Sequence, residues 1–410
     1  MKNHSPEKKN RTSSFKNVLL ETAWLYEDER IVGTETRLAC LRLIDGKIAD
    51  ILPNDPQADA VDAQGKLMLP AFRDMHTHLD KSLYGLPWKA VDGKNRTVQD
   101  MIALEQRIIP ELLASSVARS QQLISLLQGF GIHHARSHFN VDPTSGLDSL
   151  YHLQEALAKQ AAGFSAELVA FPQHGIFYTD SGQLMREAAG LPGVDFIGGL
   201  DPYSIDGSIA KPLDFIVQLA LDEEKGIDIH LHETGFSGMQ TIHYLLDRVL
   251  ENPALKGKTT ISHAYALAYL SNVEAEGIAE RLVEAEVAIA SAIPFAGMQL
   301  PIPTLVDKGV KLLVGNDNIQ DHWATFGSGN ILEKMRLIAE LYQYVTEEEL
   351  SRTLGWATGG ITPLNRAGEQ QWPKAGDVAN FVLVDASCSA EAVARVAPVC
   401  ALVHQGKQVF

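Results

Sequence analysis

The sequence predicts an α/β protein: a (β/α)8 TIM-like barrel with a small β-sandwich domain built from both ends of the chain. Two observations predict this fold. Eight short apolar runs recur about 30 residues apart after a longer first interval, and helical patterns separate most of them. Two strand-rich segments lie outside this alternation, one near each end of the chain. An open, doubly wound sheet is the alternative for the alternating part.

The two ends of the chain are expected to form the β domain. Residues 1–16 are polar and basic, and we predict a disordered arm there. Residues 17–67 are rich in strand patterns and include a hairpin signal at Asp45 and Gly46. Residues 366–410 contain two more short apolar strands. We expect the segments 17–67 and 366–410 to pair into one small domain.

Residues 68–365 are expected to form the barrel. Amphipathic segments in this region predict helices between the strands. Their ranges are 97–128, 147–162, 212–225 and 329–344. The apolar runs that predict the strands are 66–78, 131–138, 166–173, 194–201, 226–233, 259–263, 286–292 and 310–317.

Composition and charge make several kinds of binding partner unlikely for this chain. The 410 residues include 35 basic and 51 acidic side chains, a formal net charge of -16, which disfavours nucleic acid and anionic membranes as partners. The three cysteines are scattered without a CxxC pair, which fits a reducing compartment. No apolar signal segment is visible at the start. We expect a soluble, cytoplasmic protein.

Polar side chains end nearly every predicted barrel strand, where (β/α)8 enzymes hold their chemistry. His76 and His78 lie two residues apart and therefore on one face of a strand, although alone they could be ordinary hydrogen-bonded histidines. The whole set indicates a metal site, because imidazole and carboxylate groups suit zinc or iron. It comprises His76, His78, His138, Gln173, Asp201, His230, Glu233, His263 and Asp317.

Several motifs resemble the amidohydrolase superfamily: PAFRDMHTHLDKS, HLHE, ISHA and VGNDN. VAFPQHGI and NDNIQDHW resemble its cytosine deaminase branch, with relatives that act on aminotriazines. The resemblance spans most of the chain. It implies a metal-dependent hydrolase that releases ammonia or an amine from a pyrimidine-like or triazine ring, by attack of hydroxide generated at the metal. The alternative is hydrolysis of a cyclic amide at the same site.

The resemblance also implies a role for each site residue. One divalent metal, zinc or iron(II), would be bound by His76, His78, His230 and Asp317. Glu233 would be the general acid and base, and His263 would orient the hydroxide; Asp317 counts as catalytic as well as a ligand. The ring would contact Gln173, Asn318, Trp323 and Asp201.

Two departures from the relatives refine these expectations. Dinuclear relatives use a carboxylated lysine at the end of strand four, where this chain has Asp201, so we expect a single metal. Asn318 replaces a second aspartate of bacterial cytosine deaminases, so the substrate need not be cytosine.

For Lys81, an ion pair is favoured slightly over a substrate contact. The expected partner is a small heterocycle, and the chain is expected to form a homo-oligomer, as relatives often do.

Overall fold

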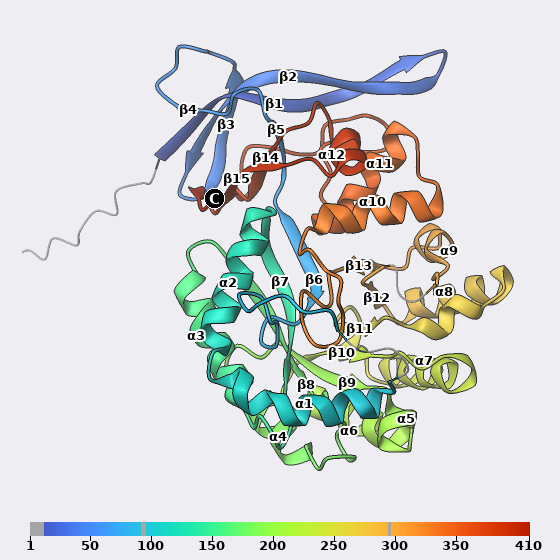
Figure 1. Cartoon of the computed structure of the whole chain (residues 1–410). Helices are drawn as coiled ribbons and strands as arrows, with labels where there is room; N and C mark the ends of the chain where they lie inside the picture. Colours follow the sequence, from blue (N-terminus) through green and yellow to red (C-terminus); the bar gives the residue numbers. More distant parts are fainter. Residues whose placement is uncertain (1–11, 92–95, 294–296) are drawn as a thin grey trace, which may run out of the picture.

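The computed structural model describes residues 12–91, 96–293 and 297–410, which contain two eight-stranded sheets (Figure 1). The barrel sheet has parallel strands that pair in chain order, as the alternating pattern predicts. These strands are β6 (Phe72–Thr77), β7 (Ile132–Asn140), β8 (Ser165–Phe171), β9 (Phe196–Leu200), β10 (Gly226–His230), β11 (Thr259–Ser262), β12 (Val287–Ser291) and β13 (Leu312–Val314).

Helices from α1 to α9 connect the barrel strands and lie around the outside of the barrel, whereas α10 and α11 follow the last barrel strand and α12 connects β14 with β15 (Figure 1). The predicted helix over 97–128 is two helices, because α1 ends at Leu113 and α2 begins at Ser116. The helices are α1 (Val98–Leu113), α2 (Ser116–Gly129), α3 (Asp148–Gln160), α4 (Gly182–Ala189), α5 (Pro202–Asp206), α6 (Ala210–Asp222), α7 (Gly235–Glu251), α8 (Asn272–Glu284), α9 (Ile302–Asp307), α10 (Ile331–Tyr342), α11 (Glu347–Leu354) and α12 (Ser389–Arg395).

The barrel closes where its last strand meets its first. Thr77 at the end of β6 forms a parallel bridge with Asp317, and the Asp317 N–H donates to the His76 carbonyl at 2.7 Å. Gly315 permits this approach, because a Cβ there would lie 2.4 Å from the backbone N and O of His76. The contact rules out the open-sheet alternative and brings Asp317 beside the segment His76–Thr77–His78.

The second sheet joins both ends of the chain, with strand order β16-β15-β14-β5-β1-β2-β3 and β4 beside β1. It curls around a core of its own, in which the Phe15 and Phe381 rings meet edge to face at 5.4 Å. The strands are β1 (Thr12–Glu27), β2 (Arg30–Ile44), β3 (Lys47–Pro53), β4 (Val61–Asp62), β5 (Leu67–Pro70), β14 (Phe381–Val384), β15 (Val399–His404) and β16 (Lys407–Gln408).

Two predicted boundaries differ from the structure. The arm prediction is wrong for residues 12–16, because β1 begins at Thr12 and pairs with Ile44; residues 1–11 lie outside the described part of the chain. The apolar run at 66–78 is two strands, not one. Its first part, β5, pairs with β1 and β14 in the second sheet, and the chain enters the barrel only at Phe72.

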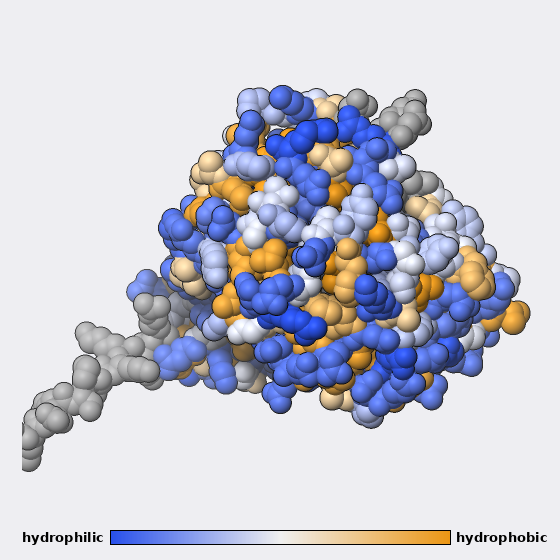
Figure 2. Space-filling model, turned by 90° about the horizontal axis from the view of Figure 1, so that it is seen from below, coloured by the Kyte–Doolittle hydropathy of each residue, from blue (hydrophilic) through white to orange (hydrophobic). Residues whose placement is uncertain are grey.

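The face of the molecule seen in Figure 2 is mixed in character. Figure 2, which views the molecule from below relative to Figure 1, shows hydrophobic residues scattered among hydrophilic ones. Within the described ranges, every helix is too short or too polar to cross a lipid bilayer.

Candidate metal centre and active site

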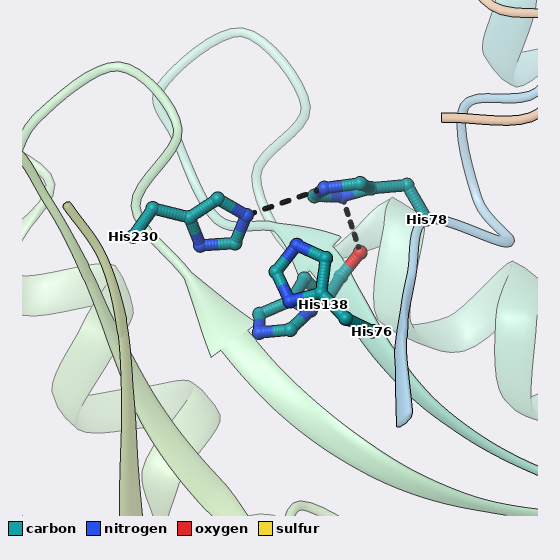
Figure 3. A group of neighbouring side chains, drawn as sticks. All are labelled: His76, His78, His138 and His230. Carbon is teal, nitrogen blue, oxygen red and sulfur yellow. Dashed lines mark hydrogen bonds between the residues drawn. The ribbon is translucent and has the colours of Figure 1, made fainter. Parts of the chain in front are cut away.

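The four predicted metal ligands meet at the carboxyl ends of the barrel strands. His76 and His78 lie at the end of β6, His230 ends β10, and Asp317 follows β13. Asp317 Oδ1 lies 3.3 Å from Nε2 of both His76 and His78, and His230 Nε2 lies 3.3 Å from His78 Nε2. All three imidazoles are buried, and their rings face one another (Figure 3).

Hydrogen bonds at the far side of two rings set their tautomers. His78 Nδ1 lies 3.2 Å from the carbonyl oxygen of His138, so Nδ1 carries the proton. The single hydroxyl proton of Ser262 goes to Asp228 Oδ1 at 2.6 Å, so Ser262 must accept from His76 Nδ1 at 2.9 Å. With Nδ1 as the donor, Nε2 is the ring nitrogen that would offer a lone pair to a metal in each imidazole.

These lone pairs point toward the Asp317 carboxylate, which is also a hydrogen-bond acceptor. Electron-pair donors that converge in this way can bind a cation between them. The His76 and His78 Nε2 atoms each lie 3.3 Å from Asp317 Oδ1. An imidazole and carboxylate donor set fits zinc or iron(II), and each Nδ1 hydrogen bond orients its ring as in known metal sites. The buried cluster can therefore bind a metal ion.

The possible ligand atoms form two overlapping groups that share His76 and His230. The first group adds His78 and His138, and the second adds His263 and Asp317. The predicted ligand set takes members from each. His138 is the residue to which sequence analysis gave no role, although its place at the end of a predicted strand was a signal. Its ring centroid lies 4.4 Å from that of His76 and 4.6 Å from that of His230.

Asp228 anchors the cluster from inside the barrel, and sequence analysis did not single it out. It lies two residues before His230 on β10, on the same face of the strand. Besides the Ser262 hydroxyl, its carboxylate accepts from Arg136 Nη1 at 3.0 Å. The contact with His138 and the charge of Arg136 hold the pKa of Asp228 far below its usual value despite complete burial, so Asp228 remains an acceptor for Ser262.

Glu233 lies just beyond β10 and is buried. Its Oε1 accepts from the Ser204 backbone N–H at 2.7 Å and the Ser204 hydroxyl at 3.0 Å. Its Oε2 lies 3.5 Å from the Thr241 hydroxyl, a long contact. Burial raises the pKa of Glu233, and the Ser204 hydrogen bonds oppose that rise. One oxygen is thus fixed, while the other is available for proton exchange.

Asp201 was predicted to contact the substrate ring, but in the structure its carboxylate is bonded to neighbouring protein groups. Its Oδ1 accepts from the backbone N–H groups of His232 and Glu233, at 2.6 and 3.1 Å, and its Oδ2 lies 2.8 Å from His232 Nδ1. Both oxygens are therefore engaged by the loop that carries Glu233. The geometry indicates that Asp201 positions this loop and does not face a ring.

His263 follows β11 and lies against the cluster. Its ring centroid is 4.8 Å from that of His76 and 4.5 Å from that of His232, on which it stacks. Its Nδ1 lies 3.4 Å from the Tyr265 hydroxyl. Its Nε2 is buried without a hydrogen-bond partner among the described residues, so this nitrogen is available to a group in the site.

The predicted ring contacts Gln173 and Trp323 lie together around Lys81. Lys81 Nζ donates to Gln173 Oε1 at 2.5 Å and lies 5.5 Å from the centroid of the Trp323 ring. Asn318 is placed beside Asp317 in the chain, and its amide nitrogen donates to Asp321 Oδ2 at 2.6 Å. One of its two N–H donors is therefore used, while the second N–H and the carbonyl oxygen remain for other partners.

Comparison with known proteins finds no matching family model but clear relatives. The uncharacterized protein YahJ of Escherichia coli K12 is 49% identical over 399 residues, 96% of this chain and 86% of that protein. N-isopropylammelide isopropyl amidohydrolase of Pseudomonas sp. strain ADP is 26% identical over 299 residues, 71% of this chain and 73% of the enzyme.

Solved structures match over nearly the whole chain. N-isopropylammelide isopropylaminohydrolase of Burkholderia multivorans has a TM-score of 0.83 at 27% identity, covering 97% of this chain and 98% of the other. 5-Methylcytosine deaminase of Klebsiella pneumoniae has a TM-score of 0.78 at 25% identity, covering 96% and 98%. The chain belongs to the amidohydrolase superfamily, in its cytosine deaminase-like branch. This confirms the resemblance that the HLHE and VGNDN motifs and the His76–Thr77–His78 segment indicated.

Proposed function

We propose that this amidohydrolase is a metal-dependent hydrolytic deaminase of an amino-substituted pyrimidine-like or triazine ring. The observation that carries the proposal is the meeting of two Nε2 lone pairs and the Asp317 carboxylate around one point, with Glu233 in the adjoining loop. Relatives named as N-isopropylammelide and pterin hydrolases or deaminases support the class of reaction.

One divalent metal ion, zinc or iron(II), would be held by His76, His78, His230 and Asp317. Bound there, such an ion would lower the pKa of water from about 15.7 to about 7 and so supply a nucleophile near neutral pH. The hydrogen bonds with Ser262 and with the His138 carbonyl orient the imidazoles of His76 and His78 toward the metal position. We further propose a cytoplasmic location and a homo-oligomeric state.

Glu233 moves the protons. Ser204 fixes Oε1, so Oε2 would take the proton from the attacking water and deliver it to a ring nitrogen, then to the departing amine. A buried carboxyl with a raised pKa holds a proton more readily than one in water, which suits both halves of this transfer. Positioned proton transfer of this kind contributes roughly a hundred- to ten-thousandfold in rate.

His263 and the residues around Lys81 would hold the reacting ring. The unpartnered Nε2 of His263 would form a hydrogen bond with the oxygen that adds to the ring, stabilising charge as it develops. Gln173 would bind the ring edge, and Trp323 would form a wall of the site.

The first prediction is that Glu233→Gln keeps the metal content of the wild type but loses at least a hundredfold in ammonia release. The amide retains an oxygen for Ser204 but cannot carry the proton. Metal is measured by elemental analysis of protein purified without added metal. Ammonia is measured on a panel of aminated pyrimidines, pterins and triazines.

Glu223→Gln is the matched control, because Glu223 is an exposed glutamate at the end of α6, outside the site. Its activity should equal that of the wild type. Undiminished ammonia release by Glu233→Gln would contradict the proposal. Release of acid without ammonia, from a cyclic amide, would instead support ring-opening hydrolysis.

A further inference from the structure

A cavity of about 380 Å³ lies at the amino ends of the barrel strands, at the opposite end of the barrel from the metal cluster. Its walls come from the starts of β11, β12 and β13 and from the end of α8, with Arg136 of β7 and Phe196 of β9 among the lining residues. This volume is within the range of small-molecule sites. The proposed reaction uses none of the lining residues, so the cavity poses a separate question.

Arg136 is a buried arginine that keeps one nitrogen for a ligand. It is 7% exposed, and its Nε donates to Glu167 Oε2 at 2.8 Å. Its Nη1 donates to Asp228 Oδ2 and to the Thr260 hydroxyl, both at 3.0 Å. Its Nη2 has no hydrogen-bond partner among the described residues. The guanidinium lies 4.0 Å from the centroid of the Phe196 ring, which lines the same cavity, so Nη2 is the donor that Arg136 has left to offer there.

Two lysines line the cavity with Arg136. Lys258 lies two residues before Thr260, which contacts Arg136 inside the barrel, and Lys311 lies two residues before Leu313, which packs within the barrel. Backbone hydrogen bonds of the sheet extend to the carbonyls of both lysines, and residues two apart on a strand share a face. Both lysines therefore continue the inward-facing side of their strands.

The ammonium groups of these two lysines are also unused. Lys258 and Lys311 are exposed, and within the described part of the chain neither side chain forms an ion pair or a hydrogen bond. Asp228 and Glu167 balance the charge of Arg136, so attraction for a further anion comes from the two lysines. Glu286, the acidic residue of the lining, opposes it. In a chain with a net charge of -16, a lining with three cations and one anion is a local reversal of sign.

The donors of this cavity suit an anion with several oxygen atoms. We propose that the cavity binds a small oxyanion, an inorganic phosphate or a dicarboxylate, through Arg136 Nη2 and the ammonium groups of Lys258 and Lys311. Hydrogen bonds from cations to such oxygens are about twice as strong as neutral ones, and a planar guanidinium matches their geometry. The ligand would contact the same guanidinium that neutralises Asp228. This site is independent of the proposed reaction.

The test is calorimetric titration of the protein as purified, with sodium phosphate and separately with malonate, at constant ionic strength. We expect the wild type to bind at least one of the two anions. The double variant Lys258→Met and Lys311→Met should bind it at least tenfold more weakly, because two charged donors are lost. Both lysines are exposed, so this variant should fold normally, whereas loss of Arg136 would leave Asp228 buried without its counterion.

Two further measurements locate the site. Lys407→Met is the matched control, because Lys407 is an exposed lysine on β16 of the second sheet, and it should bind the anion as the wild type does. Acylation of lysines by acetic anhydride, read by mass spectrometry, should slow at least threefold at Lys258 and Lys311 when the anion is present. Acylation of Lys407 should not change.

The outcomes decide the proposal without reference to ammonia release. An anion held only at the metal would bind equally well to the wild type and the double variant, and that result overturns the proposal. So does a wild type that binds neither phosphate nor malonate. If thermal unfolding shows that the double variant is misfolded, the labelling of the wild type decides: protection of both lysines supports the site, and unchanged acylation rates refute it.

Discussion

Glu21 is a buried carboxyl group far from the metal cluster, between β1 and the start of α12. It is 1% exposed and accepts from the backbone N–H of Ser389 at 2.5 Å and from the Ser389 hydroxyl at 3.1 Å. Burial raises the pKa of Glu21 to about 7, although both Ser389 hydrogen bonds oppose the rise. The folded protein therefore holds a proton there that the unfolded chain releases at a lower pH.

This difference predicts a loss of stability as pH rises. Between the unfolded pKa of 4.5 and the folded pKa of about 7, the unfolded chain gives up the proton first, so the free energy of unfolding falls through this range and stays lower above it. The loss amounts to about 3 kcal/mol. Glu21→Gln should remove it, because the amide has no charge to bury and still accepts from Ser389.

Urea unfolding of both proteins between pH 5 and 8 measures the effect. The stability difference between Glu21→Gln and the wild type should grow with pH in favour of the variant. Parallel pH profiles for the two proteins would show that Glu21 ionises normally in the folded state.

At the scale of elements, β13 places the last ligand. This strand has three residues, and the segment after it reaches Asp317 through Gly315, whose missing Cβ lets the backbone pass His76. The backbone of Asp317 has a positive φ of 61° and donates to the His76 carbonyl. The geometry of the cluster thus depends on how closely β6 and β13 approach.

Gly315→Ala should separate these two segments and lower metal affinity at least tenfold, because the new methyl group would meet the His76 backbone at 2.4 Å. Competition with a chelator, followed by elemental analysis, measures the affinity. Gly277→Ala is the matched control, since Gly277 lies in the exposed part of α8 with open space around its Cβ position. This control should bind metal normally and be stabilised by about 0.5–1 kcal/mol. Equal metal affinity in both variants would contradict the argument.

At the scale of the whole molecule, the second sheet has a hydrophobic core of its own on one face, while residues of β5, β14 and β15 also belong to the core of the barrel. The second core is assembled from sequence that is more than 300 residues apart, because β5 pairs with β1 on one side and with β14, from the other end of the chain, on the other. The Phe15 and Phe381 contact joins these two ends directly. The second sheet therefore fixes both ends of the chain without contributing to the metal cluster.

Phe381→Ala should cost about 3–5 kcal/mol in the free energy of unfolding, since it empties a fully buried position. The metal content of the protein that remains folded should be unchanged. Phe410→Ala, at an exposed phenylalanine near the other end of the same sheet, serves as the control and should cost little. Loss of metal in Phe381→Ala at temperatures where it stays folded would mean that the two cores are coupled.

The sequence alone determined the alternation of eight strands with helices, because strand and helix periods are local, and it marked the polar strand ends where parallel strands place their chemistry. The closure of these strands into a barrel was decided by the contact between Thr77 and Asp317. The sequence could not determine where the run 66–78 divides between two sheets, since LMLPAF is apolar throughout and both sheets bury it. A repeat of apolar residues reports burial, not the identity of the neighbouring strand.

Only the tertiary structure decided the partners of the polar groups. Asp201 and Asp228 look alike in the sequence, each an acid in a strand or at its end, yet one holds the Glu233 loop and the other orients Ser262 and His76. Lys81 and Gln173 are 92 residues apart and meet across the site. Hydrogen bonds act over about 3 Å, so the folded arrangement of distant strand ends, and not the local pattern, assigns each side chain its role.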